Sequence, residues 1–126
     1  MHAVIETPSF ITDCRSAGLS DDEVSNIVAL IAADPSAGDI IPGTGGARKL
    51  RFAGRGKGKS GGYRAVSYFA GENVPVLLLA LVNKDERADL SQSERNELRN
   101  ELAGYARDYR ANVRKRAVNL RRRGRR

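Results

Sequence analysis

The sequence predicts an α+β domain in which two N-terminal helices pack on a mainly antiparallel sheet of about four strands, followed by a long basic C-terminal helix. Helical hydrophobic spacing occupies the first part of the chain and returns in the last third. Between them, residues 48–82 contain three consecutive β-type runs separated by glycine-containing turns. With 126 residues, we expect a single domain, comprising a core over residues 1–90 and the amphipathic helix and basic tail over residues 91–126.

The N-terminal helices are predicted from their ends. A short strand, AVIET, is followed by a helix over residues 9–17 that places Phe10 and Cys14 on one face and stops at the next glycine. The SDDE stretch at residues 20–23 is a capping box with acidic residues in the first turn, where they suit the helix dipole. Helical spacing then continues until the Asp-Pro pair at 34–35, which ends the second helix.

The strands are predicted from alternation and β-branched composition. Residues 37–46 are rich in glycine and proline and are expected to form a loop. The RKLRF run that follows alternates in polarity, so one face carries Leu50 and Phe52 and the other carries Lys49 and Arg51. A glycine-rich loop leads to YRAVSYF, and a further turn leads to VPVLLLALV, which is typical of a buried central strand.

The last third of the chain predicts one long helix. The SQSE stretch at residues 91–94 is a second capping box, and hydrophobic residues follow it at spacings of three and four: Leu98, Leu102, Tyr105, Tyr109 and Val113. We expect this helix to run to about Leu120. Its end, VRKRAVNLRRRGRR, contains no acidic residue, so the final residues are expected to form a solvated arm or to bind something anionic.

The composition indicates which kind of partner the protein binds and in which cellular compartment it works. The net charge of +7 favours a polyanionic partner such as nucleic acid, a ribosome or an acidic protein. The single cysteine, Cys14, cannot form an internal disulfide and is consistent with a reducing cytoplasm. We expect no signal peptide and no membrane association, because the longest apolar run, at 74–82, is too short to span a bilayer.

The glycine-rich loop AGRGKGKSGGYR resembles a nucleotide-binding P-loop but does not match one. The pattern requires a glycine five positions before the Gly-Lys-Ser of residues 58–60, where this chain has Ala53. A P-loop also leads into a helix, whereas two glycines and a strand-forming run follow here. We therefore expect a basic hairpin loop that contacts backbone phosphates.

The usual catalytic and metal-binding constellations are absent from the sequence. The only histidine, His2, lies near a terminus that we expect to fray. Without paired cysteines or further histidines there is no zinc site to propose, and no metal or cofactor is expected. Cys14 has no histidine to activate it, so it is expected to pack in the core.

Clustered cations are the most informative feature. They lie on two predicted neighbouring strands, in the loop between these strands and after the last strand: Lys49, Arg51, Arg55, Lys57, Lys59, Arg64 and Lys84. If the strands pair as hairpins, these residues converge on one face of the sheet. Each one alone is more simply a solvated surface residue, but side by side they repel one another, and an anion between them best explains the cluster.

Three fragments in combination, RKLR, GKSGGYR and KDERADLS, resemble the RelE/ParE toxin superfamily, and its HigB-like branch most closely. The resemblance covers roughly residues 4–102 and implies the compact RelE-like fold. It also implies a toxin of a toxin–antitoxin pair, active as a ribosome-dependent mRNA endoribonuclease that cuts in the A site by attack of the 2′-hydroxyl on the phosphodiester.

The resemblance further implies which residues act. Matching the motifs residue by residue implies a catalytic set of Lys49, Arg51, Arg64 and Lys84. We expect Arg64 to clamp the phosphate, Lys49 to be the candidate base, and Lys84 to be an acid or second clamp. Further contacts to RNA are expected from Arg48, Arg55, Lys57, Lys59, Arg87, Arg114, Lys115 and Arg116.

The implied partners are the ribosome, mRNA and a cognate antitoxin, expected to be of helix-turn-helix type, with operator DNA reached only through that antitoxin. Two alternatives remain open because fold does not determine function. One is a ParE-like inhibitor of DNA gyrase on the same fold. The other is a noncatalytic RNA- or ribosome-binding protein.

Overall fold

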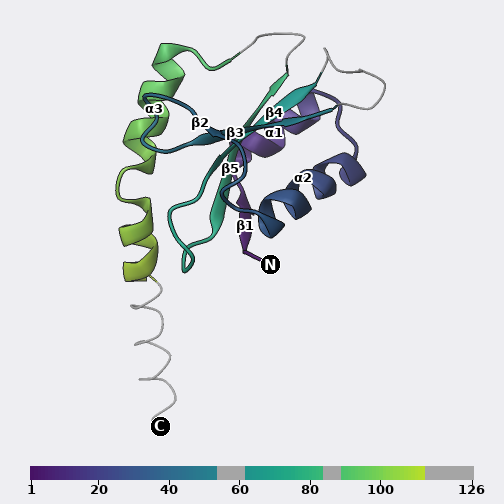
Figure 1. The fold of residues 1–126 in the computed structure, drawn as a ribbon. Coiled ribbons are helices and arrows are strands. Elements are labelled where there is room, and N and C mark those ends of the chain that lie inside the picture. The colour runs from purple at the N-terminus through teal and green to yellow at the C-terminus, as the bar shows by residue number, and fades with distance from the viewer. Residues whose placement is uncertain (54–61, 84–88, 113–126) are drawn as a thin grey trace.

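The computed structural model describes residues 1–53, 62–83 and 89–112 (Figure 1). Its elements follow the predicted order, with short strands at the N-terminus and before the central hairpins. In chain order they are β1 (Val4–Glu6), α1 (Pro8–Ser16), α2 (Asp21–Ala33), β2 (Asp39–Ile40), β3 (Arg48–Phe52), β4 (Tyr63–Tyr68), β5 (Val76–Asn83) and α3 (Gln92–Leu102).

The strands form one mixed sheet in the order β1-β5-β4-β3-β2. The hairpin pairs are antiparallel, as predicted, and β1 joins the far edge by running parallel to β5. We expected about four strands, and the sheet has five among the described residues. The predicted loop at 37–46 contains β2, a two-residue strand in which Asp39 pairs with Lys49 and Ile40 with Arg48.

Capping places the two N-terminal helices as predicted. At α2, the Ser20 side chain accepts a hydrogen bond from the Glu23 amide while the Glu23 carboxylate accepts one from the Ser20 amide, which completes the capping box. Thr7 caps α1, which begins at Pro8 rather than Ser9. Gly18 follows α1 with a φ of 74°, in the left-handed region that glycine tolerates best.

Each face of the sheet carries a hydrophobic core cluster, while the edge strands are partly exposed. On one face α1 and α2 cover a core that includes Phe10, Cys14, Ile27, Ile31, Ala65, Val76 and Leu78. The other face packs against α3 and the 41–47 segment through Ile41, Ala47, Val66, Leu79, Val82, Leu90 and Leu102. Burial raises the pKa of the Cys14 thiol to about 11, with a further contribution from nearby acids, so the thiol is neutral at physiological pH.

We predicted one continuous C-terminal helix, but the structure contains a break in it. α3 ends at Leu102, Gly104 adopts a φ of 83°, and residues 105–112 resume helical structure. A left-handed glycine ends the first helix and lets the chain change direction. The Tyr105 hydroxyl then donates to the Pro75 carbonyl at 3.1 Å, while its ring lies 6.3 Å from that of Tyr68. The predicted continuation to Leu120 lies beyond the described residues.

The N-terminus is anchored rather than frayed. The His2 amide donates to the Ala32 carbonyl at 2.9 Å, and its Nε2 lies 2.7 Å from the Val74 carbonyl oxygen. The His2 ring also meets the Phe69 ring edge-on, with centroids 5.1 Å apart. These contacts give the histidine a structural role just before the start of β1.

Replacing Gly38 with alanine should destabilise the edge of the sheet that carries Lys49. Gly38 has a φ of 93°, and an added Cβ would overlap the Lys49 carbonyl oxygen. We expect the free energy of unfolding to fall by about 1–3 kcal/mol, measured by urea denaturation. Gly18→Ala is the matched control, because Gly18 also has a positive φ but an added Cβ there meets nothing within 4 Å. Equal losses in both variants would show that the overlap contributes nothing.

Candidate active site

Three of the predicted catalytic cations lie together on the sheet face that packs against α3. Arg51 on β3 pairs directly with Arg64 on β4, and Lys49 pairs with Val66 two residues further along. Directly opposed residues in an antiparallel pair project to the same side, and so do residues two apart on a strand. Leu50 and Phe52 pack on the opposite face, as the alternation predicted. We call Lys49, Arg51 and Arg64 the cationic face.

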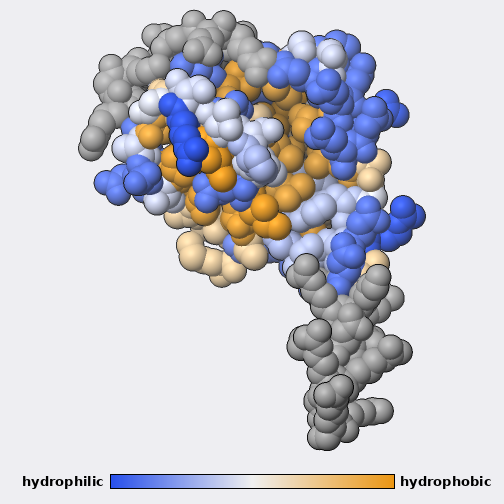
Figure 2. All heavy atoms as spheres, turned by 180° about the vertical axis from the view of Figure 1, so that it is seen from behind, coloured by the Kyte–Doolittle hydropathy of each residue, from blue (hydrophilic) through white to orange (hydrophobic). Residues whose placement is uncertain are grey.

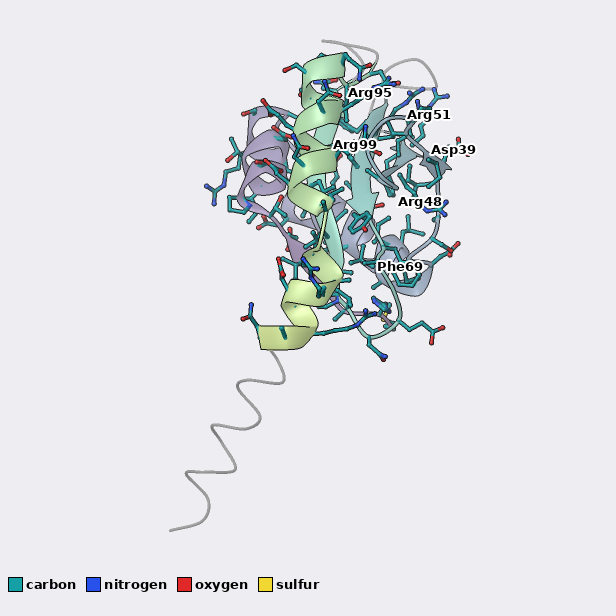
Figure 3. The ribbon with its side chains drawn as sticks, turned by 90° about the vertical axis from the view of Figure 1, so that its left-hand side faces the viewer. Asp39, Arg48, Arg51, Phe69, Arg95 and Arg99 are labelled. Carbon is teal, nitrogen blue, oxygen red and sulfur yellow. The ribbon has the colours of Figure 1, made fainter. Side chains whose placement is uncertain are left out.

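A carboxylate joins the cationic face to α3. Asp89 accepts a hydrogen bond from Lys49 Nζ at 2.9 Å through Oδ2, and the same oxygen lies 3.5 Å from a guanidinium nitrogen of Arg95. Its other oxygen, Oδ1, accepts from the Leu90 amide at 2.8 Å. Figure 3 shows Arg51 from the sheet and Arg95 from α3 at the same end of the molecule.

The pKa of Asp89 reflects two opposing causes. Partial burial acts to raise the pKa of this carboxyl. Hydrogen bonds from Lys49 and the Leu90 amide, together with the positive charges of Lys49 and Arg95, outweigh burial and hold the pKa below its ordinary value of 3.8. Asp89 is therefore ionised at neutral pH, and the local charge of the Lys49–Asp89–Arg95 group is that of a single cation.

This pKa predicts a pH dependence of stability. A depressed pKa in the folded state gives a contribution that is present above the unfolded pKa and is lost as the pH falls through the folded value. Asp89→Asn should thus lower the free energy of unfolding by about 1 kcal/mol or less at pH 7. The difference from wild type should narrow below about pH 4, as followed by urea unfolding. A difference that stays constant down to pH 3 would contradict the assignment.

Sequence reasoning missed both Asp89 and Arg95. Asp89 was part of the KDERADLS fragment but had no assigned role, and its contact with Lys49 spans 40 positions in the chain. Arg95 is a half-buried residue of α3, and one of its guanidinium nitrogens lies 3.5 Å from the Pro42 carbonyl oxygen. Its buried Nε has no hydrogen-bond partner among the described residues. The available signal was an acid placed two residues before the capping box that begins at Ser91.

The other predicted residues divide into two groups. Arg48 lies on β3 but alternates away from Lys49 and Arg51, and its guanidinium donates to the Gly38 carbonyl at 3.1 Å. It does not join the cationic face. The remaining predicted residues lie outside the described parts of the chain: Arg55, Lys57, Lys59, Lys84, Arg87, Arg114, Lys115 and Arg116.

The strand pairing decides the P-loop question. Phe52 at the end of β3 pairs with Tyr63 at the start of β4, so the basic glycine loop joins two antiparallel strands. A P-loop instead joins a strand to a helix. An added Cβ at Gly62 would lie 2.6 Å from the Phe52 carbonyl oxygen, which explains the glycine at the end of the loop.

A separate hollow lies between α1 and α3, and hydrophobic side chains show between hydrophilic ones on this side of the molecule (Figure 2). Its lining includes Leu79, Ala80, Leu90 and Leu98, together with four acidic residues: Asp13, Glu94, Glu97 and Glu101. These carboxylates would repel a phosphate backbone. The cationic face, and not this hollow, is therefore the candidate site for RNA.

The described residues contain neither a metal site nor a membrane span. Within residues 1–53, 62–83 and 89–112, no group of three or more histidine, cysteine, aspartate or glutamate side chains is placed to hold a metal ion. No helix in these ranges is long and apolar enough to cross a bilayer.

Comparison with known proteins decides the family. A family model described as "RelE toxin of RelE / RelB toxin-antitoxin system" matches residues 3–125, nearly the whole chain. The chain belongs to the RelE toxin family. This family confirms the predicted superfamily and its place in a toxin–antitoxin system, and it implies a cognate antitoxin. The HigB-like branch stays a prediction.

A solved structure of a RelE toxin is also similar to this chain. It is a double arginine-to-alanine mutant of the E. coli toxin RelE in the free state. The two share 15% sequence identity with a TM-score of 0.49, over 68% of this RelE-family toxin and 85% of that chain.

Proposed function

We propose that this RelE-family toxin is a ribosome-dependent mRNA endoribonuclease that cleaves in the A site. The observation that carries the proposal is the convergence of Lys49, Arg51 and Arg64 on one sheet face. Arg51 and Arg64 lie directly opposite each other across two strands, so both guanidinium groups can donate to one phosphate. The net charge of +7 further favours a polyanionic partner.

The proposed reaction needs cations at defined positions. The ribose 2′-oxygen attacks the adjacent phosphorus and the bond from phosphorus to the 5′-oxygen breaks, leaving a 2′,3′-cyclic phosphate and a 5′-hydroxyl. Charge builds up on the phosphoryl oxygens as the bond to the attacking oxygen forms, so donors placed there lower the barrier. We assign this role to Arg64, whose planar guanidinium can hold two phosphate oxygens at once, with Arg51 on the flanking phosphate.

The contact to Asp89 changes the role we give to Lys49. An ammonium whose proton is shared with a carboxylate 2.9 Å away donates, and it must lose that proton before it can accept another. We therefore propose that Lys49 donates to a phosphoryl oxygen or to the leaving 5′-oxygen, in place of the role of base expected from sequence. Lys84 is our candidate for the other proton transfer, since β5 ends at Asn83, which pairs with Tyr63 beside Arg64.

We propose that cleavage depends on the ribosome because the cationic face is small. Its three cations, Lys49, Arg51 and Arg64, span one strand pair and can hold one or two phosphates but not a long RNA segment. We propose that the ribosome positions the message and that other basic residues contact ribosomal RNA. The candidates are Arg55, Lys57, Lys59, Arg87, Arg114, Lys115 and Arg116.

Pulsed expression in cells tests the proposal. Messages should acquire new 5′-hydroxyl ends in phase with codons within minutes, but only where they are translated; an untranslated copy of the same message is the control. A DNA-damage reporter measured in the same cells should stay silent. Intact messages together with an induced reporter would favour gyrase inhibition, and intact messages with a silent reporter would favour a noncatalytic binder.

A further inference from the structure

Asp89 is an acid placed within a cluster of cations that should bind an anion. Each negative charge there weakens attraction to RNA, so its presence calls for a compensating benefit. The structure holds this carboxylate firmly. Its neighbour Leu90 is buried in the core beneath α3, and the capping box of Ser91 and Glu94 fixes the first turn of the helix that follows.

The contacts that Asp89 makes with other described residues restrict where its carboxylate can point. Oδ1 is held by the Leu90 amide at 2.8 Å, which leaves Oδ2 facing Lys49 at 2.9 Å and Arg95 at 3.5 Å. Arg95 in turn is held by α3 and by the Pro42 carbonyl. The carboxylate is thus fixed from the backbone on one side and from a half-buried guanidinium on the other, and Lys49 is the partner with a flexible side chain.

We propose that Asp89 is a positioning residue that holds the Lys49 ammonium on the cationic face in the geometry needed for RNA cleavage. This inference rests on the proposed function. A lysine side chain has four rotatable carbon–carbon bonds and three N–H donors. Asp89 takes one donor and fixes Nζ in space, which leaves two donors for a phosphate. Fixing a donor before the substrate binds removes the cost of ordering it during the reaction.

Asp89 is expected to act in opposite directions on RNA affinity and on the cleavage rate, and this combination distinguishes the proposal from a purely structural role. Its negative charge lowers affinity for RNA, while its hold on Lys49 raises the rate of cleavage. Asp89→Asn keeps an oxygen acceptor for the Leu90 amide but removes the charge. We expect this variant to bind RNA about two- to fivefold more tightly. We expect it to cleave about 10- to 100-fold more slowly, because a donor displaced by about 1 Å can cost that much.

Asp39 provides a matched control. It is exposed on β2 (Figure 3), where it pairs with Lys49 across the ladder. The hydrogen bond of Lys49 Nζ goes instead to Asp89. Asp39→Asn removes one negative charge beside the same lysine but leaves its hydrogen bond in place. It should raise affinity for RNA in the same way as Asp89→Asn and leave the cleavage rate within about twofold of wild type. Asp89→Glu, which retains the charge, should recover part of the lost rate.

The experiment measures binding and turnover separately. Binding is followed by fluorescence anisotropy with a 2′-O-methylated RNA oligonucleotide, which cannot be cleaved, at several salt concentrations. Turnover is the single-turnover rate on mRNA held in the ribosomal A site. Tighter binding with slower cleavage for Asp89→Asn, and tighter binding with unchanged cleavage for Asp39→Asn, supports the proposal. Cleavage by Asp89→Asn at or above the wild-type rate overturns it, and so does a parallel loss of binding, turnover and melting temperature.

A third measurement separates this inference from the proposed function. Nitrogen-15 relaxation of the lysine Nζ groups reports the order of Lys49 without any reaction. We expect an ordered Lys49 in wild type and Asp39→Asn, and a mobile one in Asp89→Asn. If the wild-type toxin cleaves no RNA, the proposed function fails. An equally mobile Lys49 in all three proteins overturns the positioning role even if cleavage is observed.

Discussion

Replacing Arg64 with alanine should slow mRNA cleavage by about 10²- to 10³-fold, the usual effect of removing one donor to a developing negative charge. Arg64 lies directly opposite Arg51 and diagonal to Lys49, whose partner Val66 is two residues further along β4. A guanidinium holds two phosphate oxygens in a fixed geometry, and alanine offers neither donor nor charge. The measurement is the single-turnover rate on ribosome-bound mRNA.

Two further variants sharpen the Arg64 test. Arg64→Lys keeps the charge but loses the planar guanidinium that can hold two phosphate oxygens, so we expect a rate between those of wild type and Arg64→Ala. Arg99→Ala removes one arginine from the exposed surface of α3, and its rate should stay within about twofold of wild type (Figure 3). Circular dichroism and the melting temperature confirm that each variant is folded. Full activity in a folded Arg64→Ala protein would remove Arg64 from the mechanism.

Replacing Phe10 with alanine should lower the free energy of unfolding by about 3–5 kcal/mol. The Phe10 side chain is fully buried where α1 packs on β5, and it lies in the same core cluster as Ile31 and Leu78. Alanine removes most of its apolar contacts and leaves a cavity that the surrounding side chains can only partly fill. A loss of this size is a large share of the 5–15 kcal/mol by which domains are usually stable.

Ile11 is the matched control for Phe10. It is the next residue on α1 and is 37% exposed, so Ile11→Ala should cost about 1 kcal/mol or less. Urea denaturation of both variants gives the comparison. The two substitutions losing equal stability would contradict the packing described here. Phe10→Ala should also reduce toxicity through loss of folded protein, whereas Arg64→Ala should do so with the fold intact.

Local signals explain which parts of the fold were predictable. The capping boxes at Ser20 and Ser91 involve residues three apart, so both helix starts could be predicted from the sequence alone. Alternation in RKLRF correctly separated Leu50 and Phe52 from Lys49 and Arg51. The same alternation also predicts that Arg48 lies on the face of Leu50. The structure has Arg48 there, away from the cationic face, with its guanidinium donating to the Gly38 carbonyl.

Features that depend on distant contacts could not be predicted in this way. The parallel pairing of β1 with β5 brings Val4 beside Val76, and no local pattern specifies it. The break at Gly104 interrupts an otherwise regular hydrophobic spacing, and it precedes a contact between Tyr105 and the distant Pro75. The partner of Lys49 is equally remote in sequence, which is why the acid in the candidate site emerged only from the fold.

The most direct test of the account is the chemistry of the cleaved ends in a purified system. Wild-type toxin is added to mRNA alone and to the same mRNA bound in ribosomes with an open A site. We predict cleavage within the A-site codon only when the ribosome is present, with a 2′,3′-cyclic phosphate on one fragment and a 5′-hydroxyl on the other. Intact mRNA in both reactions, or fragments carrying 5′-phosphates, would contradict the account.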